Sequence, residues 1–333
     1  MEQRIVFNGP KRAELEAFSV PAVKDGEVEV RVSVSLMSTG TEGIIYNRWF
    51  DPGTHWDNWI KYPFHPGYSA VGTVAAAGSG VSSPKVGDRV AIRKSHASAH
   101  VLPAAQCIVV PPVVSDEQAA WFALAKIAAM GARVAGHGLG SSVLVIGAGP
   151  IGQMAIRWAF VAGAEAIIVV DPVGPRLELA RVGGATATID KPIAEAAPLI
   201  LQANHGSNPR VVIDSTGNAE VFAVALSVVE RFGTVVVLGD TGAPAQQRLS
   251  PDLITKGLRV VGAHDTHETA EWNAGIIARL FFQAVSDGRF RFGSLVSHTF
   301  PPQEAGAAYE LATHHRKDTM GILFDWKGRG RGK

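Results

Sequence analysis

Cysteine and net charge are both scarce in this chain. A single cysteine, Cys107, among 333 residues excludes intramolecular disulfides, so nothing indicates an oxidising compartment. The 31 basic and 30 acidic side chains leave a formal charge of +1, which gives no general attraction to nucleic acid or acidic membranes. The polar start, MEQRIVFNGPKR, is unlike a signal peptide, and no apolar run reaches membrane-spanning length. We therefore expect a soluble, cytoplasmic protein with no nucleic-acid or membrane partner.

What is present is enough hydrophobic sequence for two cores, at 47% of the chain. Residues 1–114 consist mostly of short alternating strands and glycine-rich turns, such as VEVRVSV at 28–34, which predicts a β-rich domain. Helices and strands alternate over 115–269, which predicts a doubly wound parallel sheet. Strand-like pieces at 295–300 and 322–326 are expected to return to the first domain. We interpret the basic end, KGRGRGK, as a solubilising tail.

The most informative stretch runs from residue 142 to residue 171. An apolar strand at 142–146 leads into GAGPIG, a helical pattern follows, and a second apolar strand at 166–170 ends in an acid. This order predicts a dinucleotide-binding βαβ unit whose helix N-terminus faces the phosphates. The three glycines permit, in turn, the tight bend, the approach of a pyrophosphate and close packing of helix on strand. The turn residues assigned to the cofactor are Gly147, Gly149, Pro150, Ile151 and Gly152.

The acid after the second strand bears on which cofactor is bound. Asp171 follows Gly152 by 19 residues, where a carboxylate can take both hydroxyls of the adenosine ribose. The same carboxylate repels a 2′-phosphate, so the sequence favours NAD over NADP. Arg176 would soften that repulsion, or it is a solvated residue of the next helix. Loops after the later strands are expected to hold the rest of the cofactor, through Ser215, Thr216, Gly239, Asp240 and His264.

Five local signatures together resemble the medium-chain dehydrogenase/reductase superfamily. They are VGDRVAI at 86–92, GAGPIG at 147–152, VVIDSTGN at 211–218, GTVVVLG at 233–239 and GILFDW at 321–326. The resemblance implies a GroES-like catalytic domain at 1–114, completed by 270–333, and a Rossmann NAD-binding domain at 115–269. It also implies a homodimer, which is common in this family and which exposed strands after Leu258 would suit.

The zinc-dependent alcohol dehydrogenases of that family place metal ligands in C-G-T-D and G-H-E segments and in the helix before the nucleotide fold. This chain has Thr39-Gly40-Thr41-Glu42 in the first segment and Gly67-Tyr68-Ser69 in the second, and the third position falls near Ala123. One cysteine also cannot supply the four thiolates of the structural zinc. We therefore predict no metal site and a zinc-independent protein.

Without zinc, alcohol–carbonyl interconversion needs side chains that move a proton and stabilise an oxyanion. Lys126 is the only charge in AAWFALAKIAAM, on a helix predicted over 116–134, and it is a candidate for holding the oxyanion. The alternatives are that it reaches solvent or pairs with Glu117 or Glu42. Tyr68 and Thr39, at the lost ligand positions, are candidates for orienting substrate or passing on a proton, or they only fill space.

Two further residues complete the candidate catalytic set. Glu42 corresponds to an acid that supports the metal site in relatives, and here it is a candidate for positioning Lys126 or a substrate hydroxyl, or for stabilising the turn. His264 follows the last sheet strand, and its neighbour Asp265 is a candidate for setting its tautomer. The H-x-x-H spacing with His267 lacks a nearby third ligand, so we do not interpret it as a metal site.

Three functions are compatible with these residues. The favoured one is a zinc-independent, NAD-dependent oxidoreductase that interconverts a secondary alcohol, such as a polyol, sugar or cyclitol, and a ketone. A reductase of enones or quinones is an alternative, although that branch generally uses NADPH and Asp171 opposes it. A non-catalytic NAD-binding subunit is the third, because a fold does not dictate its chemistry.

Overall fold

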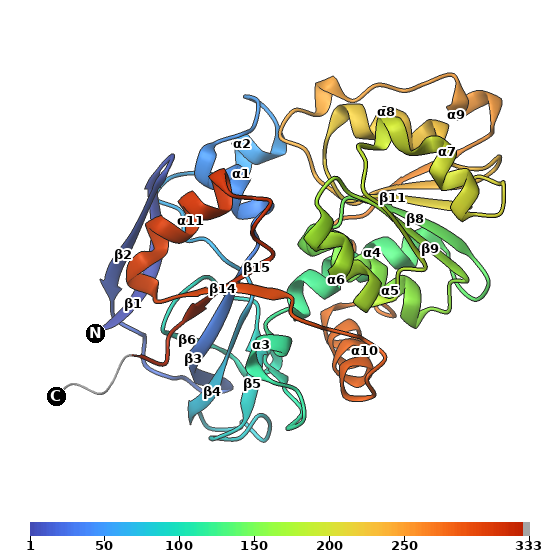
Figure 1. Ribbon diagram of the computed structural model, residues 1–333. Helices are drawn as coiled ribbons and strands as arrows, with labels where there is room; N and C mark the ends of the chain where they lie inside the picture. The colour runs from blue at the N-terminus through green and yellow to red at the C-terminus, as the bar shows by residue number, and fades with distance from the viewer. Residues whose placement is uncertain (329–333) are drawn as a thin grey trace. The chain divides into compact units, whose positions relative to one another are not determined.

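The computed structural model describes residues 1–328, so most of the predicted basic tail lies outside the described residues (Figure 1). The chain divides into two compact units, which are described separately. Unit 1 comprises residues 1–49, 55–123 and 295–333, and unit 2 comprises 50–54 and 124–294. Within residues 1–328, none of the helices combines the length and the apolar character needed to cross a bilayer.

Unit 1 is built on a seven-stranded sheet in the order β14-β15-β3-β4-β5-β7, with β6 also paired to β3. From residue 27 to residue 34 the central strand, β3, alternates half-buried or exposed residues with buried ones, as the sequence predicted. It pairs antiparallel with β4, β6 and β15. A separate hairpin is formed by β1 and β2. The strands are β1 (Glu2–Gly9), β2 (Arg12–Phe18), β3 (Glu27–Met37), β4 (Ala70–Ala77), β5 (Arg89–Ile92), β6 (Ala99–Pro103), β7 (Ile108–Val109), β14 (Val296–Phe300) and β15 (Gly321–Asp325).

The helical elements of unit 1 are short. They are α1 (Thr41–Asn47), α2 (His55–Trp59), η1 (Ala104–Gln106), α3 (Asp116–Ala119), η3 (Pro302–Glu304) and α11 (Ala305–His314). The helix predicted over 116–134 is interrupted: α3 ends before Ala120, whose carbonyl accepts a hydrogen bond from the buried Ser69 hydroxyl at 2.5 Å. The chain resumes as α4 (Phe122–Ala135), which begins at the end of unit 1 and continues into unit 2.

Unit 2 contains the predicted doubly wound parallel sheet. Its six strands have the order β10-β9-β8-β11-β12-β13, and all five pairings are parallel. The strands are β8 (Ser142–Ile146), β9 (Ala166–Val170), β10 (Ala187–Ile189), β11 (Val211–Asp214), β12 (Thr234–Val237) and β13 (Arg259–Gly262). The registers of Ile146 opposite both Val170 and Asp214 place their carboxyl ends level, so the loops that follow emerge at one edge.

Helices link the strands of unit 2, and their apolar faces are buried, as in the core cluster formed by Ile193, Ile200 and Phe222 with strand residues. The helices are α5 (Pro150–Val161), α6 (Gly174–Gly183), α7 (Ile193–Ala203), α8 (Ala219–Ser227), η2 (Pro244–Gln246), α9 (Asp252–Thr255) and α10 (Ala274–Ser286).

The unit boundaries differ from the predicted domain boundaries of 114/115 and 269/270. Residues 115–123 belong to unit 1, because Asp116 accepts from Ser33 of the central strand and Ala120 from Ser69. Residues 270–294 belong to unit 2, where Phe281 and Phe290 form an aromatic cluster with Trp158 of α5. Residues 270–294 pack in the core of unit 2 because their aromatic rings have apolar partners there. The pattern of strands and helices in the sequence could not show which of the two cores this segment joins.

Candidate functional site

The glycine turn of unit 2 has the geometry that its sequence predicts. Gly147 has a φ of +88°, which an L-residue with a side chain rarely adopts. A Cβ at Gly152 would overlap the carbonyl oxygen of Gly147, so helix α5 and strand β8 approach too closely for any other residue. Gly149 is the N-cap of α5 and has no side-chain cap, and Pro150 occupies the first turn. The first-turn N–H groups, including that of Ile151, therefore remain available to an anion.

Asp171 lies at the carboxyl end of β9, directly beside this turn. It is only 5% exposed, and its two carboxylate oxygens accept backbone hydrogen bonds from Ala148 at 2.7 Å and from Val173 at 2.9 Å. Arg176 places a guanidinium nitrogen 4.0 Å from Asp171 Oδ2, so it is a neighbour of the acid and not simply a solvated side chain. A carboxylate oxygen has capacity for further hydrogen bonds, so Asp171 fits the ribose role that the sequence predicts.

The loops after β11 and β12 close around the same turn. The Ser215 hydroxyl donates to the carbonyls of Ile146 and Gly147 at 3.0 and 2.9 Å, and Thr216 donates to Asp214 at 2.7 Å. Gly239 lies against the backbone of residues 215–217, where a Cβ would clash. Asp240 accepts from the next backbone N–H at 2.8 Å. The predicted cofactor residues of these loops therefore lie at one edge of the sheet. The hydroxyl of Ser215 is used there to hold the glycine turn in place.

Lys126 is almost completely buried on α4 and is held by acids from the loop after β13. Its ammonium nitrogen lies 2.9 Å from Asp265 Oδ1 and 2.5 Å from Glu268 Oε1, and it donates to the Asp265 carbonyl at 2.8 Å. Three acceptors match the three protons of an ammonium group. Lys126 is therefore paired with acids, as one of the alternatives expected, but the acids are not Glu117 or Glu42. Glu42 does not position this lysine.

His264, in the same loop, is exposed. Its Nδ1 lies 2.8 Å from the Thr266 hydroxyl and accepts from the Thr266 backbone N–H at 3.2 Å. Asp265 is paired with Lys126, and the Nδ1 partner that the structure gives His264 is Thr266, so the role of Asp265 in setting the tautomer stays a prediction. His264 and His267 are adjacent, with ring centroids 5.8 Å apart, but no acidic or cysteine ligand completes a metal site there among the described residues.

In unit 1, Glu42 is the centre of a buried polar cluster. Its carboxylate accepts from the Ser38 backbone N–H at 2.7 Å and from the Tyr309 hydroxyl at 2.5 Å, and it lies 3.0 Å from His96 Nε2. Glu42 is 1% exposed and His96 is fully buried. The acid therefore joins α1, the loop after β5 and α11 of the returning segment.

The direction of the hydrogen bonds in this cluster can be worked out from its donors. Trp326 donates its indole N–H to the Ser35 hydroxyl at 2.9 Å, and that hydroxyl lies 2.8 Å from His96 Nδ1. If Ser35 donates its proton to Nδ1, the imidazole is neutral and carries its proton on Nε2, facing Glu42. Every named group then has a partner, and the buried anion of Glu42 accepts from three donors, which offsets its loss of hydration.

Tyr68 adjoins this cluster through Ser38. Its hydroxyl donates to the Ser38 side chain at 2.5 Å, and the guanidinium of Arg93 lies 5.2 Å from its ring centroid. Burial raises the pKa of Tyr68 to about 12, so the phenol is neutral at pH 7 and can form hydrogen bonds but is a weak base. Thr39 is half-buried in the turn before α1. Ser38 thus connects the two residues, because its hydroxyl contacts Tyr68 and its backbone N–H contacts Glu42. Thr39 is the next residue after Ser38 in the chain.

The residues at the family's metal-ligand positions do not fit zinc. Hydroxyls at Thr39, Tyr68 and Ser69 and a methyl group at Ala123 replace the thiolate and imidazole ligands that zinc prefers. The Ser69 hydroxyl is already bonded to a backbone carbonyl. Across residues 1–328, no three histidine, cysteine or acidic side chains gather in a way that could hold a metal ion.

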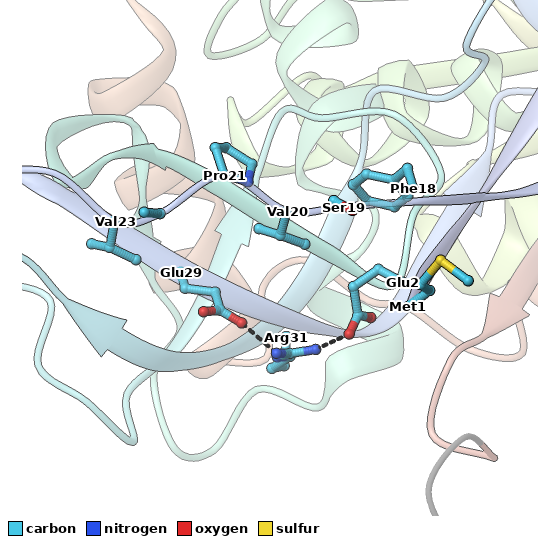
Figure 2. A pocket seen from close by; sticks show the side chains of 10 residues that line it. Met1, Glu2, Phe18, Ser19, Val20, Pro21, Val23, Glu29 and Arg31 are labelled. Carbon is cyan, nitrogen blue, oxygen red and sulfur yellow. Dashed lines mark hydrogen bonds and ion pairs between the residues drawn. The ribbon is translucent and has the colours of Figure 1, made fainter.

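Two hollows lie in the surface of the described part of the chain, and of the site residues discussed above only His267 lines one of them. One, of about 400 Å³, is lined by Met1, Phe18 and Val20 among others, and its cation, Arg31, is already paired with Glu2 and Glu29 (Figure 2). The other, of about 500 Å³, lies in unit 2 between α4 and residues 267–272. Neither hollow is lined by a predicted catalytic or cofactor residue.

Several residues of the site could not be found in the sequence. Tyr309, Ser38 and Glu268 acquire their roles only through partners that are remote in the chain, as with Tyr309 and Glu42, 267 positions apart. A signal did exist for His96, a histidine in a segment otherwise composed of small residues. Its full burial beneath Gly67, where a Cβ would lie 2.7 Å from the imidazole, was not predictable.

Comparison with known proteins agrees with this architecture. Residues 24–111 match the family model described as the alcohol dehydrogenase GroES-like domain, and residues 150–280 match the one described as zinc-binding dehydrogenase. L-threonine 3-dehydrogenase of Bacillus subtilis is 26% identical over 337 residues, covering 91% of this chain and 93% of the relative. Sorbitol dehydrogenase of Bombyx mori is 27% identical over 356 residues, covering 92% and 94%.

Solved structures show the same fold. An Escherichia coli oxidoreductase/dehydrogenase of unknown specificity superposes with a TM-score of 0.84 at 20% identity, covering 97% of this chain and 99% of the other. RspB of E. coli CFT073, solved in complex with NADH, superposes with a TM-score of 0.80 at 23% identity, with the same coverage.

A GroES-like β unit and a Rossmann sheet with a glycine turn define an alcohol dehydrogenase-type oxidoreductase fold. The ranges that the two family models match contain or overlap four of the five sequence signatures, those at 86–92, 147–152, 211–218 and 233–239. The chain belongs to the medium-chain dehydrogenase/reductase superfamily, as the sequence predicted.

The tyrosines of unit 1 give a testable property. Burial raises the pKa of all four tyrosines in the chain, Tyr46, Tyr62, Tyr68 and Tyr309, above 10. Nearby carboxylates raise it further for three of them, Tyr46, Tyr68 and Tyr309. Unfolded tyrosines ionise near pH 10, so the raised values contribute stability that is present below pH 10 and is lost as the pH rises through the folded values.

We therefore expect tyrosinate absorbance to appear only at pH values above the ordinary tyrosine pKa, together with loss of native circular dichroism. The measurement is a spectrophotometric titration followed in parallel by circular dichroism. Tyrosinate absorbance developing near pH 10 in a protein that keeps its native spectrum would contradict these burials.

Proposed function

We propose that this chain is a cytoplasmic, zinc-independent oxidoreductase that uses NAD(H) to interconvert a secondary alcohol, of the polyol, sugar or cyclitol kind, and a ketone. The relatives named above are a threonine and a sorbitol dehydrogenase, which supports alcohol oxidation as the reaction class. The observation that carries the proposal is the glycine turn with Asp171 beside it. Bound NAD would supply the hydride acceptor, and Asp171 with the turn N–H groups would hold its adenosine ribose and pyrophosphate.

Roles for the candidate catalytic residues follow from their partners. We propose that Thr39 and Tyr68 form hydrogen bonds with the substrate hydroxyl. Tyr68 is suited to this role because its phenol is neutral at pH 7. Glu42 positions both through Ser38, whose N–H it binds and whose hydroxyl meets Tyr68. Lys126 holds the loop that carries His264, and exposed His264 exchanges protons with solvent in this proposal.

Asp171→Ala tests the cofactor assignment. Loss of a charged hydrogen-bond acceptor is expected to weaken NADH binding by about tenfold or more, while NADPH binding falls less because repulsion of its 2′-phosphate is relieved. Both affinities are measured by fluorescence titration. Asp190→Ala is the matched control, since Asp190 follows the neighbouring strand β10 but is exposed. A wild type that binds neither dinucleotide, or an unchanged NADH to NADPH ratio, would contradict the assignment.

The reaction itself is tested with a panel of secondary alcohols, polyols and sugars supplied with NAD⁺, and of enones and quinones supplied with NADH. Reduction or oxidation is followed by nicotinamide absorbance. Turnover of an alcohol supports the proposal. Turnover restricted to enones or quinones would favour the reductase, and binding of NADH without any turnover would favour a cofactor-binding subunit.

Zinc independence is tested separately, because one matching family model is described as zinc-binding. We expect purified protein to contain far less than one zinc per chain by mass spectrometry of metals. Turnover should also survive dialysis against a chelator, because hydroxyl and methyl groups stand at the ligand positions. Stoichiometric zinc, or activity lost on chelation and restored by zinc alone, would refute this part of the proposal.

We also propose a homodimer formed through β13. This strand ends the sheet order of unit 2, and Arg259, Val260 and Gly262 are exposed, so one backbone edge is open to a second copy. Size-exclusion chromatography with light scattering should give the mass of two chains. Val260→Lys should shift it towards one chain, whereas Leu199→Lys, an equally exposed change on α7, should not. A monomeric wild type would refute the proposal.

A further inference from the structure

Unit 2 contains a cation buried without a carboxylate partner. Arg157 on α5 has no exposed surface, and all its hydrogen bonds go to neutral oxygens. Nε donates to the Arg291 carbonyl at 2.6 Å, and Nη2 donates to Phe292 at 2.9 Å and to Leu179 at 3.3 Å. Nη1 donates to the backbone and side-chain oxygens of Gln153 at 3.0 and 2.7 Å. Burying a charge in this way costs free energy, which indicates that the arrangement has a function.

Gln153, one helical turn before Arg157, connects the guanidinium with the glycine turn. It too is fully buried, and its amide nitrogen donates to the carbonyls of Ala148 and Arg176 at 3.0 and 2.9 Å. The opposite orientation of the amide would set its oxygen against both carbonyls and its N–H groups against the guanidinium. The three partners therefore fix which end of Gln153 faces the turn.

The Ala148 residue is consequently held from both sides. Asp171 accepts from its N–H, and Gln153 donates to its C=O. In a planar trans peptide the C=O and the following N–H point in opposite directions. With the Ala148 carbonyl turned inward to Gln153, the N–H of Gly149 is turned outward, at the N-cap of α5 where the pyrophosphate would lie.

We propose that Gln153 and Arg157 are positioning residues of the dinucleotide site, which set the Ala148–Gly149 peptide for the cofactor pyrophosphate before the cofactor binds. The inference rests on the proposed function, since it needs a dinucleotide ligand. Arg157 also adds a buried positive charge about two helical turns from the N-terminus of α5, where solvent screens it little. The pair would therefore favour ligands that carry a pyrophosphate, and it would leave binding of the adenosine end, the task of Asp171, nearly unchanged.

Gln153→Met is the direct test, because methionine keeps the length and apolar packing of the side chain but removes its donors. The probes are ADP-ribose, which carries the pyrophosphate, and adenosine, which does not, each measured by calorimetry or by competition with NADH. We expect ADP-ribose affinity to fall by about tenfold and adenosine affinity to change by less than about twofold. Gln283→Met is the matched control, since Gln283 is exposed on α10 and bonds only Asp287 in the described structure.

The outcomes separate the inference from the function on which it rests. A wild type that binds neither NADH nor ADP-ribose overturns the proposed function and this inference with it. A wild type that binds, with a Gln153→Met variant that loses affinity for both probes equally or for neither, overturns only the positioning role. Arg157→Met should show the same selective loss with a lower unfolding midpoint, because four backbone carbonyls and the Gln153 side-chain oxygen lose a hydrogen bond. If that variant does not fold, Gln153→Met alone decides.

Discussion

Everything in the cofactor half of this protein depends on how closely one helix approaches one strand. The carbonyl of Gly147 occupies the space that a side chain at Gly152 would need, so the first turn of α5 lies directly against the end of β8. That proximity brings Gln153 within reach of the Ala148 carbonyl and leaves the helix N-terminus open above. It also allows the loop after β11 to close down, since the Ser215 hydroxyl bonds the same turn. A single methyl group at residue 152 would separate all of these contacts.

The geometry of the glycine turn and the acid beside it was predictable because its determinants are neighbours in the sequence. Strand, turn, helix, strand and acid occupy thirty consecutive positions from Ser142 to Asp171, and their spacing defines their geometry. The catalytic candidates were harder, because each depends on a remote partner. Lys126 was singled out as the only charge in an apolar segment, but its acids lie about 140 positions away and were not predicted. Glu42, one of the acids considered for it, instead contacts His96 and Tyr309. Residue type suggested the chemistry, and only the fold supplied the pairing.

Three buried charges in this chain are stabilised by three different means. Lys126 is paired with two carboxylates, so its charge is neutralised locally. Glu42 has neutral or polar donors around it and keeps its negative charge in a cluster that ties together the returning segment and the first residues of α1. Arg157 has only carbonyl and amide oxygens around it. The two carboxylates beside Lys126 limit the range of its electric field. The fields of Glu42 and Arg157, which have no opposite charge beside them in these contacts, reach the neighbouring groups.

The return of the chain to its first unit has a consequence for biosynthesis. β15 pairs with β3, and Trp326 bonds Ser35, so the sheet of unit 1 is completed by residues that leave the ribosome after all of unit 2. All of unit 2 lies before residue 295 and has been synthesised by then. The nucleotide-binding unit can therefore become native before β15 is available, while residues 34–37 of β3 still lack the strand that pairs with them. During translation the exposed β3 edge, rather than the Rossmann sheet, is the part that needs protection from aggregation.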